Sequence, residues 1–550
     1  MRRRPDYIIV GGGSTGCTLA GRLTEDADTH VTLFEQGPAD RNPWIHLPVT
    51  YYKVCKGPLL SRYSYERSPE QAPAESPTMI QARVLGGGSS VNAMLYVRGV
   101  PDDYDGWAAS GADGWGYADV LPYFKRAEGN NRFHGHAHNS QGPLGVSDAR
   151  YIHPLTRVWL QACQQAGLPY NSDFNSGDQS GVGLYQVTTR DGRRSSAAVA
   201  YIRPAMGRPN FDLRTKCQVR RILFEGQRAV GVEFVERGTR HRLMAEHEVI
   251  LSAGAIATPH VLMLSGVGPA DHLGAHGVPV VCDLPGVGQN YQDHMEMSLV
   301  YSLSGPYSYD KYKKPWWAAK AGLEYLLFKN GPVTSNVAEA GGFWWSSNGT
   351  TNPDIQLFFL AGAGVEEGVD TVPGGNGCTI SVSQTRPKSR GFVELAGDDE
   401  NQPPRIVPNY LTHRDDIRCL ADGARLVQDI MKQSVLSRYV EQGHIPPRPL
   451  STTAELDAFV RSQAHPGLHP CGTCRMGRDS MAVVDPQLRV HGVEGLRIAD
   501  ASVMPDVISG NLNSVAIMIG EKAADLLRNR SAAEKGVAQA DARSLEAQRL

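Results

Sequence analysis

The chain has 550 residues, enough for two hydrophobic cores or for one large core built from separate segments. Its composition, 41% hydrophobic and 20% charged, is ordinary for a globular protein, and 55 basic against 57 acidic residues argue against a nucleic-acid partner. Nine cysteines, an odd number spread along the chain, exclude a disulfide-dense scaffold. With neither a secretory signal nor a run of about 18 apolar residues, we expect a cytoplasmic protein.

Residues 6–37 predict a strand–helix–strand unit. A short apolar run at 6–10 is followed by a glycine-rich turn, and small residues dominate the predicted helix from Ser14 to Glu25. Residues 31–35 predict the second strand, which ends at an acidic residue. This order of elements is typical of the start of a nucleotide-binding domain.

The glycine turn has the spacing of a dinucleotide-binding motif. Gly11 permits the turn, Gly13 lets a pyrophosphate approach the backbone, and Gly16 lets helix and strand pack closely. The helix N-terminus offers N–H groups and the positive end of a dipole, and Glu35 can accept hydrogen bonds from ribose hydroxyls. The acid, without an arginine beside it, argues against a ribose phosphate. A purely structural glycine turn is the alternative interpretation.

A second glycine-rich segment, residues 82–92, decides between FAD and NAD. Three glycines, two serines and an asparagine make a loop with little side-chain bulk and many hydrogen-bond donors. Such a loop can lie flat against a flavin ring and bind its polar edge. The loop therefore favours FAD, with a flexible turn as the alternative.

The remaining elements predict two domains. Further strands are expected at 219–224, 230–235, 249–252 and 496–499, and a helix at 514–528. The FAD-binding domain is predicted to comprise residues 5–150, 206–299 and 485–530. The substrate-binding domain is predicted to comprise residues 151–205 and 300–484, with strand-like alternation near 378–396. Residues 531–550 lack an apolar stripe and are predicted to form a flexible tail.

Residues 310–317 join cations to large aromatic residues ahead of an apolar, helix-like stretch at 318–328. Three interpretations stay open for this segment. It can form a lid, a contact between subunits, or a patch that touches a membrane surface and delivers electrons to a quinone. The last would make the protein peripheral at the membrane.

Two segments near the C-terminus offer acid–base chemistry. Residues 469–474 read His-Pro-Cys-Gly-Thr-Cys, and residues 509–514 read Ser-Gly-Asn-Leu-Asn-Ser. An imidazole can take a proton from a hydroxyl group while a side-chain amide hydrogen-bonds the oxygen. By itself His469 would also suit a structural role. Cys471 and Cys474 have the spacing of a zinc or redox site, but no second cysteine pair accompanies them, and we expect no metal.

Together these features resemble the glucose-methanol-choline (GMC) flavoprotein oxidoreductases. The resemblance runs from residue 5 to about residue 529 and is carried by residues 82–105, 254–268, 284–294, 484–490 and 499–505. Within the family, residues 167–175 and 331–339 indicate the branch of bacterial alcohol, L-sorbose, polyethylene-glycol and choline dehydrogenases. The implied fold is α/β: a Rossmann-like FAD-binding domain plus a substrate domain with an antiparallel sheet and helices.

The resemblance implies two catalytic residues. His469 matches the active-site histidine of the family, and Asn511 matches the position where members carry histidine or asparagine. Counting back from the closing helix selects Asn511 over Asn513, and a slip of two residues would exchange their roles. The residues implied to hold FAD are Gly11, Gly13, Ser14, Thr15, Gly16, Glu35, Arg83, Val84, Gly86, Ser90, Asn92, Ala93, Val219, Ala253, Asp500, Ala501 and Asn513.

Two departures from the family pattern carry information. Members that attach FAD covalently have a histidine where this chain has Val91, so the resemblance implies non-covalent FAD. Choline-oxidising members have a histidine in the strand that here contains Phe358, which argues against choline. Glu339 matches a carboxylate that faces the substrate cation in those members, although relatives with other substrates carry it too. Glu339, Phe358 and Phe359 form the predicted lining of the substrate pocket.

The predicted activity is oxidation of a primary or secondary alcohol to an aldehyde or ketone. His469 would abstract the hydroxyl proton, Asn511 would hydrogen-bond the oxygen, and hydride would pass to flavin N5. The partners are the alcohol and either a quinone-type acceptor or oxygen. Alternatives are an oxygen-using alcohol oxidase and a non-redox lyase of the hydroxynitrile-lyase type on the same fold. An NAD-dependent dehydrogenase is a further alternative, which a yellow purified protein would exclude.

Overall fold

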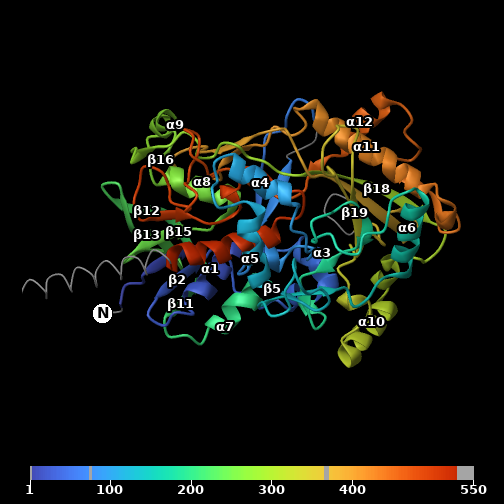
Figure 1. The fold of residues 1–550 in the computed structure, drawn as a ribbon, viewed down its shortest axis with the longest axis horizontal. Helices are drawn as coiled ribbons and strands as arrows, with labels where there is room; N and C mark the ends of the chain where they lie inside the picture. Colours follow the sequence, from blue (N-terminus) through green and yellow to red (C-terminus); the bar gives the residue numbers. More distant parts are fainter. Residues whose placement is uncertain (1–2, 73–76, 365–370, 529–550) are drawn as a thin grey trace, which may run out of the picture.

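A five-stranded parallel sheet forms one end of the elongated molecule (Figure 1). The computed structural model describes residues 3–72, 77–364 and 371–528. In spatial order the strands are β11 (Phe211–Thr215), β2 (Val31–Glu35), β1 (Tyr7–Val10), β15 (Glu248–Leu251) and β26 (Leu496–Ile498). Every residue of β1, β2 and β15 is buried, which explains their continuous apolar runs: a parallel sheet has both faces covered.

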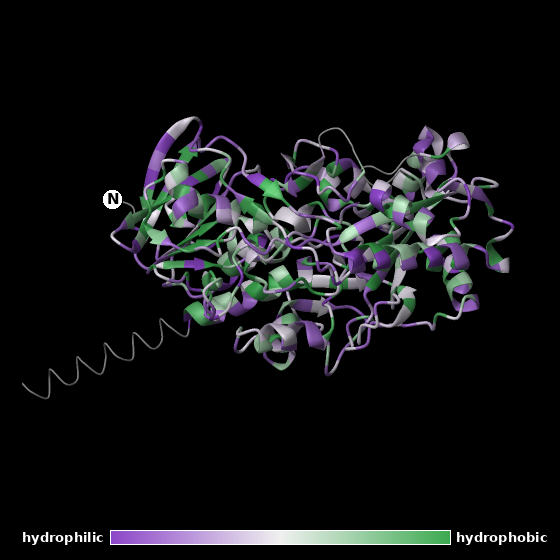
Figure 2. Cartoon of the chain, turned by 90° about the horizontal axis from the view of Figure 1, so that it is seen from above, coloured by the Kyte–Doolittle hydropathy of each residue, from purple (hydrophilic) through white to green (hydrophobic). Residues whose placement is uncertain are grey.

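Helices rich in small residues cover this sheet. Helix α1 (Ser14–Leu23) lies beside the helix at 513–528, and the hydroxyl of Thr15 donates to the carbonyl of Ala516 at 2.7 Å (Figure 1). A Cβ atom at Gly16 would lie 2.0 Å from the carbonyl oxygen of Gly11, so only glycine allows α1 to pack this close to the turn. In Figure 2 the strands near the N-terminus are mostly hydrophobic, in agreement with a buried sheet.

A three-stranded antiparallel sheet packs against the parallel sheet. It consists of β12 (Cys217–Glu225), β13 (Arg228–Glu236) and β14 (Thr239–Met244). The inner positions of β12 and β13, among them Ile222, Val232 and Phe234, join the same hydrophobic core as β1 and β2. The hairpins are therefore a layer on the parallel sheet and not an independent unit.

A six-stranded antiparallel sheet forms the other end of the molecule (Figure 1). Its strands are β19 (Ala340–Trp344), β20 (Ile355–Leu360), β21 (Gly377–Gln384), β18 (Met295–Leu303) and β24 (Val440–Ile445), with β25 (His465–Pro466) paired to β18. Helices α6 (Pro154–Gln165), α11 (Arg414–Met431) and α12 (Thr453–Gln463) pack around it, and the apolar side chains between them form a second core.

Shorter elements connect and border the two large sheets. They are α2 (Pro43–His46), α3 (Tyr51–Val54), β3 (Leu60–Ser64), β4 (Thr78–Ala82), α4 (Pro101–Ala109), α5 (Tyr117–Ala127), β5 (Glu128–Asn130), β6 (Leu144–Asp148), β7 (Gly181–Leu184), β8 (Gln186–Val187), β9 (Thr189–Arg190), β10 (Arg193–Arg194), α7 (Arg203–Ala205), α8 (Gly254–Leu264), β16 (Val267–Gly268), α9 (Ala270–Ala275), β17 (Cys282–Asp283), α10 (Pro315–Phe328), β22 (Phe392–Glu394) and β23 (Arg405–Val407). Within the described ranges, no helix combines the length and the apolar character needed to cross a membrane.

The predicted strands and the first helix are confirmed with shifts of at most two residues at their ends. The predicted limits of the two domains stay a prediction, but the limit at residue 299 falls inside β18, which belongs wholly to the antiparallel sheet. The predicted tail at 531–550 lies outside the described residues.

Candidate active site

A cavity of 1170 Å³ is lined by residues from both large sheets. At the parallel sheet, the chain leaves β1, β2, β15 and β26 at the same edge, and the residues just beyond or at these strand ends line the cavity. They are Gly11, Glu35, Ala253 and Asp500. This is where open α/β sheets bind ligands, at the carboxyl ends of their strands. The volume exceeds the roughly 300–1,000 Å³ of common small-molecule sites, which leaves room for a cofactor and a substrate together.

The glycine turn after β1 presents backbone to the cavity. Gly11 has φ of 106°, a left-handed conformation, and a Cβ there would lie 2.4 Å from the carbonyl oxygen of Ser252. Helix α1 starts after Gly13 with no side chain capping it and no acidic residue in its first turn. Its first N–H groups therefore stay available to a pyrophosphate, and Ser14 and Thr15 line the cavity beside them.

Glu35 is held rigidly at the end of β2. Its two carboxylate oxygens accept hydrogen bonds from the backbone N–H of Gly12 at 3.0 Å and of Gly37 at 2.7 Å. Burial raises the pKa of Glu35, while these two hydrogen bonds act in the opposite direction. Glu35 therefore presents a fixed carboxylate at the cavity wall, as its predicted role in binding the ribose requires.

The loop at 83–92 packs against the glycine turn and exposes backbone to the cavity. Gly87 has φ of 53°, and a Cβ there would lie 2.7 Å from the Cα of Gly13. At Gly88 a Cβ would meet no described atom within 4 Å, so this residue borders open space. The serine hydroxyls that were expected to bind the flavin are used within the loop itself. That of Ser89 donates to the carbonyl oxygen of Gly86 at 2.5 Å, and that of Ser90 to the carbonyl oxygen of Leu85 at 2.7 Å.

The helix at 513–528 contributes an unused donor. The hydroxyl of Ser14 donates to Oδ1 of Asn513 at 2.8 Å, which turns the amide nitrogen away from α1. This Nδ2 atom is buried and has no hydrogen-bond partner among the described residues, although Asn513 lines the cavity. A buried donor of this kind needs an acceptor. Together with the bare backbone at Gly13 and Gly88, it fits a bound dinucleotide, and the residues present therefore fit FAD.

Most predicted FAD-binding residues line the cavity, and four do not. Arg83, Asn92, Ala93, Val219 and Ala501 border it. Gly16, Val84, Gly86 and Ser90 lie behind its wall, where they shape the turn, the core and the loop. Their predicted contact with FAD stays a prediction.

His469 and Asn511 meet at the wall of the cavity. Nε2 of His469 lies 3.2 Å from Nδ2 of Asn511, and both residues line the cavity. Nε2 of Gln356 donates to Oδ1 of Asn511 at 3.2 Å, which orients the amide with its nitrogen toward the imidazole. The sequence-based choice of Asn511 over Asn513 agrees with this placement, because Asn513 lies on α1's side of the cavity.

A second histidine, His294, fixes the tautomer of His469. Nε2 of His294 lies 3.0 Å from the carbonyl oxygen of Ile508 and must donate to it, so a neutral His294 has its lone pair on Nδ1. That atom lies 3.0 Å from Nδ1 of His469, which must therefore carry the proton. Nε2 of His469 is left with a lone pair that accepts from Asn511. The network presents a base to the cavity.

The electrostatics keep both imidazoles neutral. Burial lowers the pKa of His469 to about 4. Burial lowers the pKa of His294 as well, with a further contribution from the neighbouring His469. The loop that carries His469 is held by Asp293, whose Oδ1 accepts from the backbone N–H of His469 at 2.7 Å. Burial raises the pKa of Asp293 to about 7.

Two residues predicted to line the substrate pocket, Phe359 and Glu339, do not border this cavity, and their role at the substrate stays a prediction. Phe359 is fully buried and stacks on Trp159, with ring centroids 5.0 Å apart. Phe358 does line the cavity, and the two differ because neighbouring residues of β20 point to opposite faces. The carboxylate of Glu339 is buried outside the cavity. Its hydrogen-bond donors are the backbone N–H of His153, the hydroxyls of Thr156 and Ser335, and Tyr309.

Glu296 is a cavity carboxylate that sequence reasoning missed. It follows His294 by two residues and lines the cavity. Its backbone lies opposite that of His465 where β18 and β25 pair. Because β18 begins at Met295, no strand period relates Glu296 to His294, and only the packing of β18 against β25 shows that Glu296 faces the cavity. Tyr65 and Phe358 also border the cavity and supply aromatic surface.

Two models of the family GMC oxidoreductase match the chain, one over residues 5–296 and the other over residues 387–520. The chain belongs to the GMC oxidoreductase family. Membership explains why the cofactor cavity and the histidine–asparagine pair occur together. The protein is therefore an FAD-dependent oxidoreductase that acts on CH–OH donors.

Relatives in the GMC family match over nearly the whole chain. The chain is 42% identical to the mitochondrial choline dehydrogenase of Homo sapiens over 558 residues, covering 99% of this chain and 93% of that protein. It is 38% identical to the alcohol dehydrogenase (acceptor) of Pseudomonas putida over 534 residues, covering 95% of each. The structure of pyridoxine 4-oxidase from Mesorbium loti superposes with a TM-score of 0.86 at 30% identity, covering 96% of this chain and 99% of that one.

Proposed function

We propose that His469 and Asn511 bind the hydroxyl group of a primary alcohol and remove its proton. The observation that carries this proposal is the convergence of a lone pair and an amide donor, 3.2 Å apart, inside the cavity. Nδ2 of Asn511 donates to Nε2 of His469 in the structure, and a hydroxyl that displaces this hydrogen bond would give its proton to Nε2 of His469. Its oxygen would then accept from Nδ2 of Asn511, which satisfies both groups.

The two residues would lower the barrier in different ways. A neutral imidazole acting as a general base contributes roughly 10²–10⁴ in rate. The amide stabilises the developing alkoxide, and loss of one such donor costs about 10²–10³. FAD, when bound, supplies the two-electron acceptor for the hydride that leaves the alcohol carbon. Because the pKa of His469 is about 4, the base is already unprotonated at neutral pH.

The leading candidate substrate is a primary alcohol with a cationic group. Glu296 places a carboxylate at the cavity wall, and Tyr65 and Phe358 add aromatic faces that attract cations. Relatives that are named choline dehydrogenase support the same class of substrate. Phe358 stands where choline-oxidising members of the family have a histidine, and on that ground the sequence argued against choline. The carboxylate of Glu296 was not considered there.

An uncharged primary alcohol is the second candidate. Phe358 lies next to the catalytic end of the cavity, since its ring is 6.1 Å from that of Tyr185, a hydrogen-bond partner of Gln356. Arg67 also lines the cavity and would offset the charge of Glu296. The Pseudomonas putida relative, named an alcohol dehydrogenase, supports this class.

One pair of compounds separates the two candidates. Choline and its carbon isostere, in which carbon replaces the quaternary nitrogen, have the same shape and differ in charge. The anaerobic rate of flavin reduction should be higher with choline, and Glu296→Gln should abolish that preference without changing the rate for the isostere. Equal rates for both compounds in the native enzyme would instead favour the uncharged alcohol.

The catalytic roles are tested by His469→Ala and Asn511→Ala. Both variants should retain FAD and should slow flavin reduction by an alcohol at least roughly a hundredfold. Bleaching of the flavin by the alcohol also excludes the lyase alternative, which leaves the flavin oxidised. Near-normal reduction in either variant would remove that residue from the mechanism.

The electron acceptor is predicted to be either a quinone-type compound or oxygen. Reducing the enzyme with its alcohol in the absence of air, and then adding either air or a soluble quinone, distinguishes them. Rapid return of the flavin absorbance with only one of the two identifies the acceptor.

A further inference from the structure

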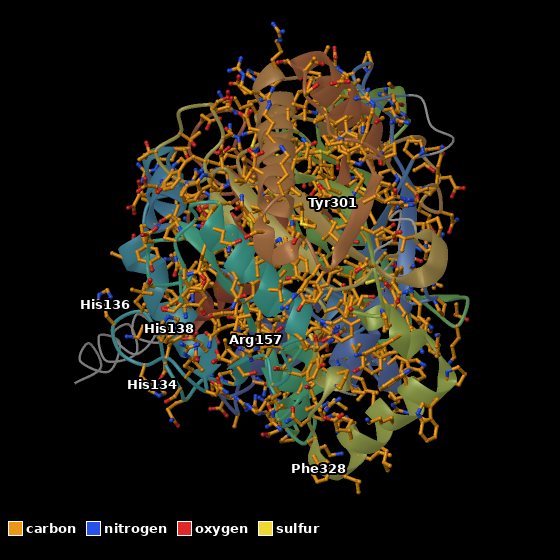
Figure 3. The ribbon with its side chains drawn as sticks, turned by 90° about the vertical axis from the view of Figure 1, so that its right-hand side faces the viewer. His134, His136, His138, Arg157, Tyr301 and Phe328 are labelled. Atoms are coloured by element: carbon orange, nitrogen blue, oxygen red, sulfur yellow. The ribbon has the colours of Figure 1, made fainter. Side chains whose placement is uncertain are left out.

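Helix α10 (Pro315–Phe328) carries large apolar side chains that the rest of the molecule does not cover. It projects from the body of the protein in Figure 1, and Phe328 lies at the outer edge in Figure 3. Trp316 is 76% exposed, Leu326 69%, Leu327 64% and Phe328 70%. Of the 14 residues of this helix only Ala321 and Tyr325 are buried, so its apolar side chains do not serve the core.

The exposure is concentrated and not scattered. The other exposed large hydrophobic residues in the described part of the chain occur singly or nearly so on different elements, as ordinary surfaces do. On α10 six of them share one helix: Trp316, Trp317, Leu323, Leu326, Leu327 and Phe328. Six exposed large apolar side chains on one short helix indicate a binding partner.

Lysines surround the apolar surface. Residues 310–329 contain five lysines and two carboxylates, whereas the whole chain has a formal charge of −2. Of the two acids, Asp310 is buried and paired with Lys313 at 2.6 Å, and Glu324 packs close to Gly331. Positive charge therefore dominates the exposed part of the segment.

The lysines lie over aromatic rings at both ends of α10. The ammonium groups of Lys311 and Lys320 lie 5.6 Å and 5.4 Å from the ring centroid of Trp317, and that of Lys329 lies 4.7 Å from that of Tyr325. Tryptophan, tyrosine and lysine in this combination are typical of segments at the boundary between lipid and water. Apolar side chains can enter the acyl region while the ammonium groups remain at the level of the lipid phosphates.

We propose that α10 docks the protein onto a bilayer surface that contains anionic lipids, lying in the plane of the membrane. The helix does not span, because 14 residues cover only about 21 Å. A second copy of the chain is a poorer partner, since a two-fold contact would bring the same lysines of each copy together. The proposal concerns a surface and does not depend on which alcohol the enzyme oxidises.

Docking would bring one wall of the active-site cavity next to the membrane. Helix α10 contacts the turn η5 (Pro332–Thr334), which contacts η1 (Pro48–Thr50). Helix α3 follows η1 directly, and its residues Tyr51 and Tyr52 line the cavity. An apolar alcohol or acceptor dissolved in the bilayer would therefore have a short path to the site.

Vesicle flotation tests the proposal with the full-length, FAD-loaded protein. Vesicles that contain phosphatidylcholine and phosphatidylglycerol in equal amounts should carry the protein to the top of a density gradient. Vesicles of phosphatidylcholine alone should carry much less of it. Replacing Lys314, Lys320 and Lys329 by glutamine should weaken binding to the anionic vesicles about fivefold for each lysine. High salt should also weaken the binding of the native protein to the anionic vesicles.

A second variant tests the apolar contribution. The triple change Trp316→Ser, Leu327→Ser and Phe328→Ser should reduce vesicle binding at least about a hundredfold while leaving FAD content and turnover of a soluble alcohol unchanged. Met206→Ser, which alters another apolar residue that is 59% exposed, is the matched control and should float like the native protein.

Three results would overturn the proposal. They are native protein that stays at the bottom with anionic vesicles, a triple serine variant that floats as the native protein does, and a concentration-dependent dimer that the triple variant abolishes without any vesicle binding. The last would assign α10 to a contact between copies. A changed Michaelis constant for a soluble alcohol, without vesicle binding, would assign it to a lid.

Discussion

At the scale of single residues, the site depends on the direction of a few hydrogen bonds. The imidazole of His469 is useful as a base only if its lone pair is on Nε2, and that is decided by His294 and the carbonyl of Ile508. The amide of Asn511 is oriented in turn by Gln356. Three residues that would not contact the alcohol therefore determine what the two proposed catalytic residues can do.

His294→Leu should slow flavin reduction by roughly ten- to a hundredfold, because Nδ1 of His469 loses its acceptor and the other tautomer becomes accessible. His294→Asn offers an amide oxygen to the same N–H group and should recover part of the rate. Stopped-flow flavin reduction measures both. Equal losses in the two variants, or loss of FAD in either, would contradict a tautomer-fixing role.

Val91 concerns the attachment of the cofactor. It lines the cavity, and an isopropyl group cannot form a bond to the flavin ring. Acid precipitation should therefore release all of the flavin into the supernatant and leave a colourless pellet. Yellow colour that stays with the precipitated chain would contradict non-covalent binding.

At the scale of elements, the sequence predicted periodicity better than function. The apolar runs of β1, β2 and β15 were recognised because both faces of a parallel sheet are buried. The pocket was harder, since Phe358 and Phe359 look equivalent in sequence and only the packing of β20 shows which one faces the cavity. Glu339 lies outside the cavity, and a buried carboxylate with several donors cannot be distinguished from a ligand-binding one by sequence.

Helix α6 ends at a titratable cap. The backbone N–H of Leu155 donates to Nδ1 of His153 at 3.2 Å, and burial, with a smaller effect of Lys311, lowers the pKa of His153 to about 4. Between this value and the unfolded value of about 6.5, the unfolded chain binds more protons than the native one. The contribution of His153 to stability is therefore complete above about pH 6.5 and is lost as the pH falls toward 4.

His153→Asn should remove this pH dependence and keep the cap, because asparagine is a good N-cap residue. Relative to the variant, the native protein should lose up to about 1.4 kcal/mol of unfolding free energy per pH unit between pH 6.5 and 4. Denaturant unfolding at several pH values measures the difference. Parallel pH profiles for the two proteins would contradict the assignment.

At the scale of the whole molecule, the site is assembled from segments that are distant in the chain. The glycine turn, the loop at 83–92, β18 and the last helix each supply part of the cavity. Local patterns identified the cofactor segments because a glycine turn between a strand and a helix has few other uses. The pairing of His294 with His469, 175 residues apart, followed from no local pattern. Tertiary contacts of this kind are outside the reach of periodicity.

Glu521 joins the two ends of the chain at the cofactor site. Its carboxylate is completely buried and binds Arg22 of α1 at 2.8 Å, Arg126 of α5 at 2.7 Å and the hydroxyl of Tyr201 at 2.7 Å. Glu521→Gln should cost up to about 3–5 kcal/mol of unfolding free energy, because the fully buried carboxylate is lost and Arg22 and Arg126 keep only the more exposed carboxylates of Glu25 and Asp525. Since α1 and the last helix carry Ser14 and Asn513, the variant should also release FAD at a lower temperature.

Asp525→Asn is the matched control for Glu521→Gln. Asp525 lies one turn along the same helix and binds Arg126 at 2.8 Å, but its side chain is 31% exposed. Solvent screens such a pair, so the change should cost less than about 1 kcal/mol. Flavin fluorescence during heating follows cofactor release, and circular dichroism follows unfolding. Equal effects of the two changes would show that burial of Glu521, and with it the connection between the chain ends, does not stabilise the cofactor site.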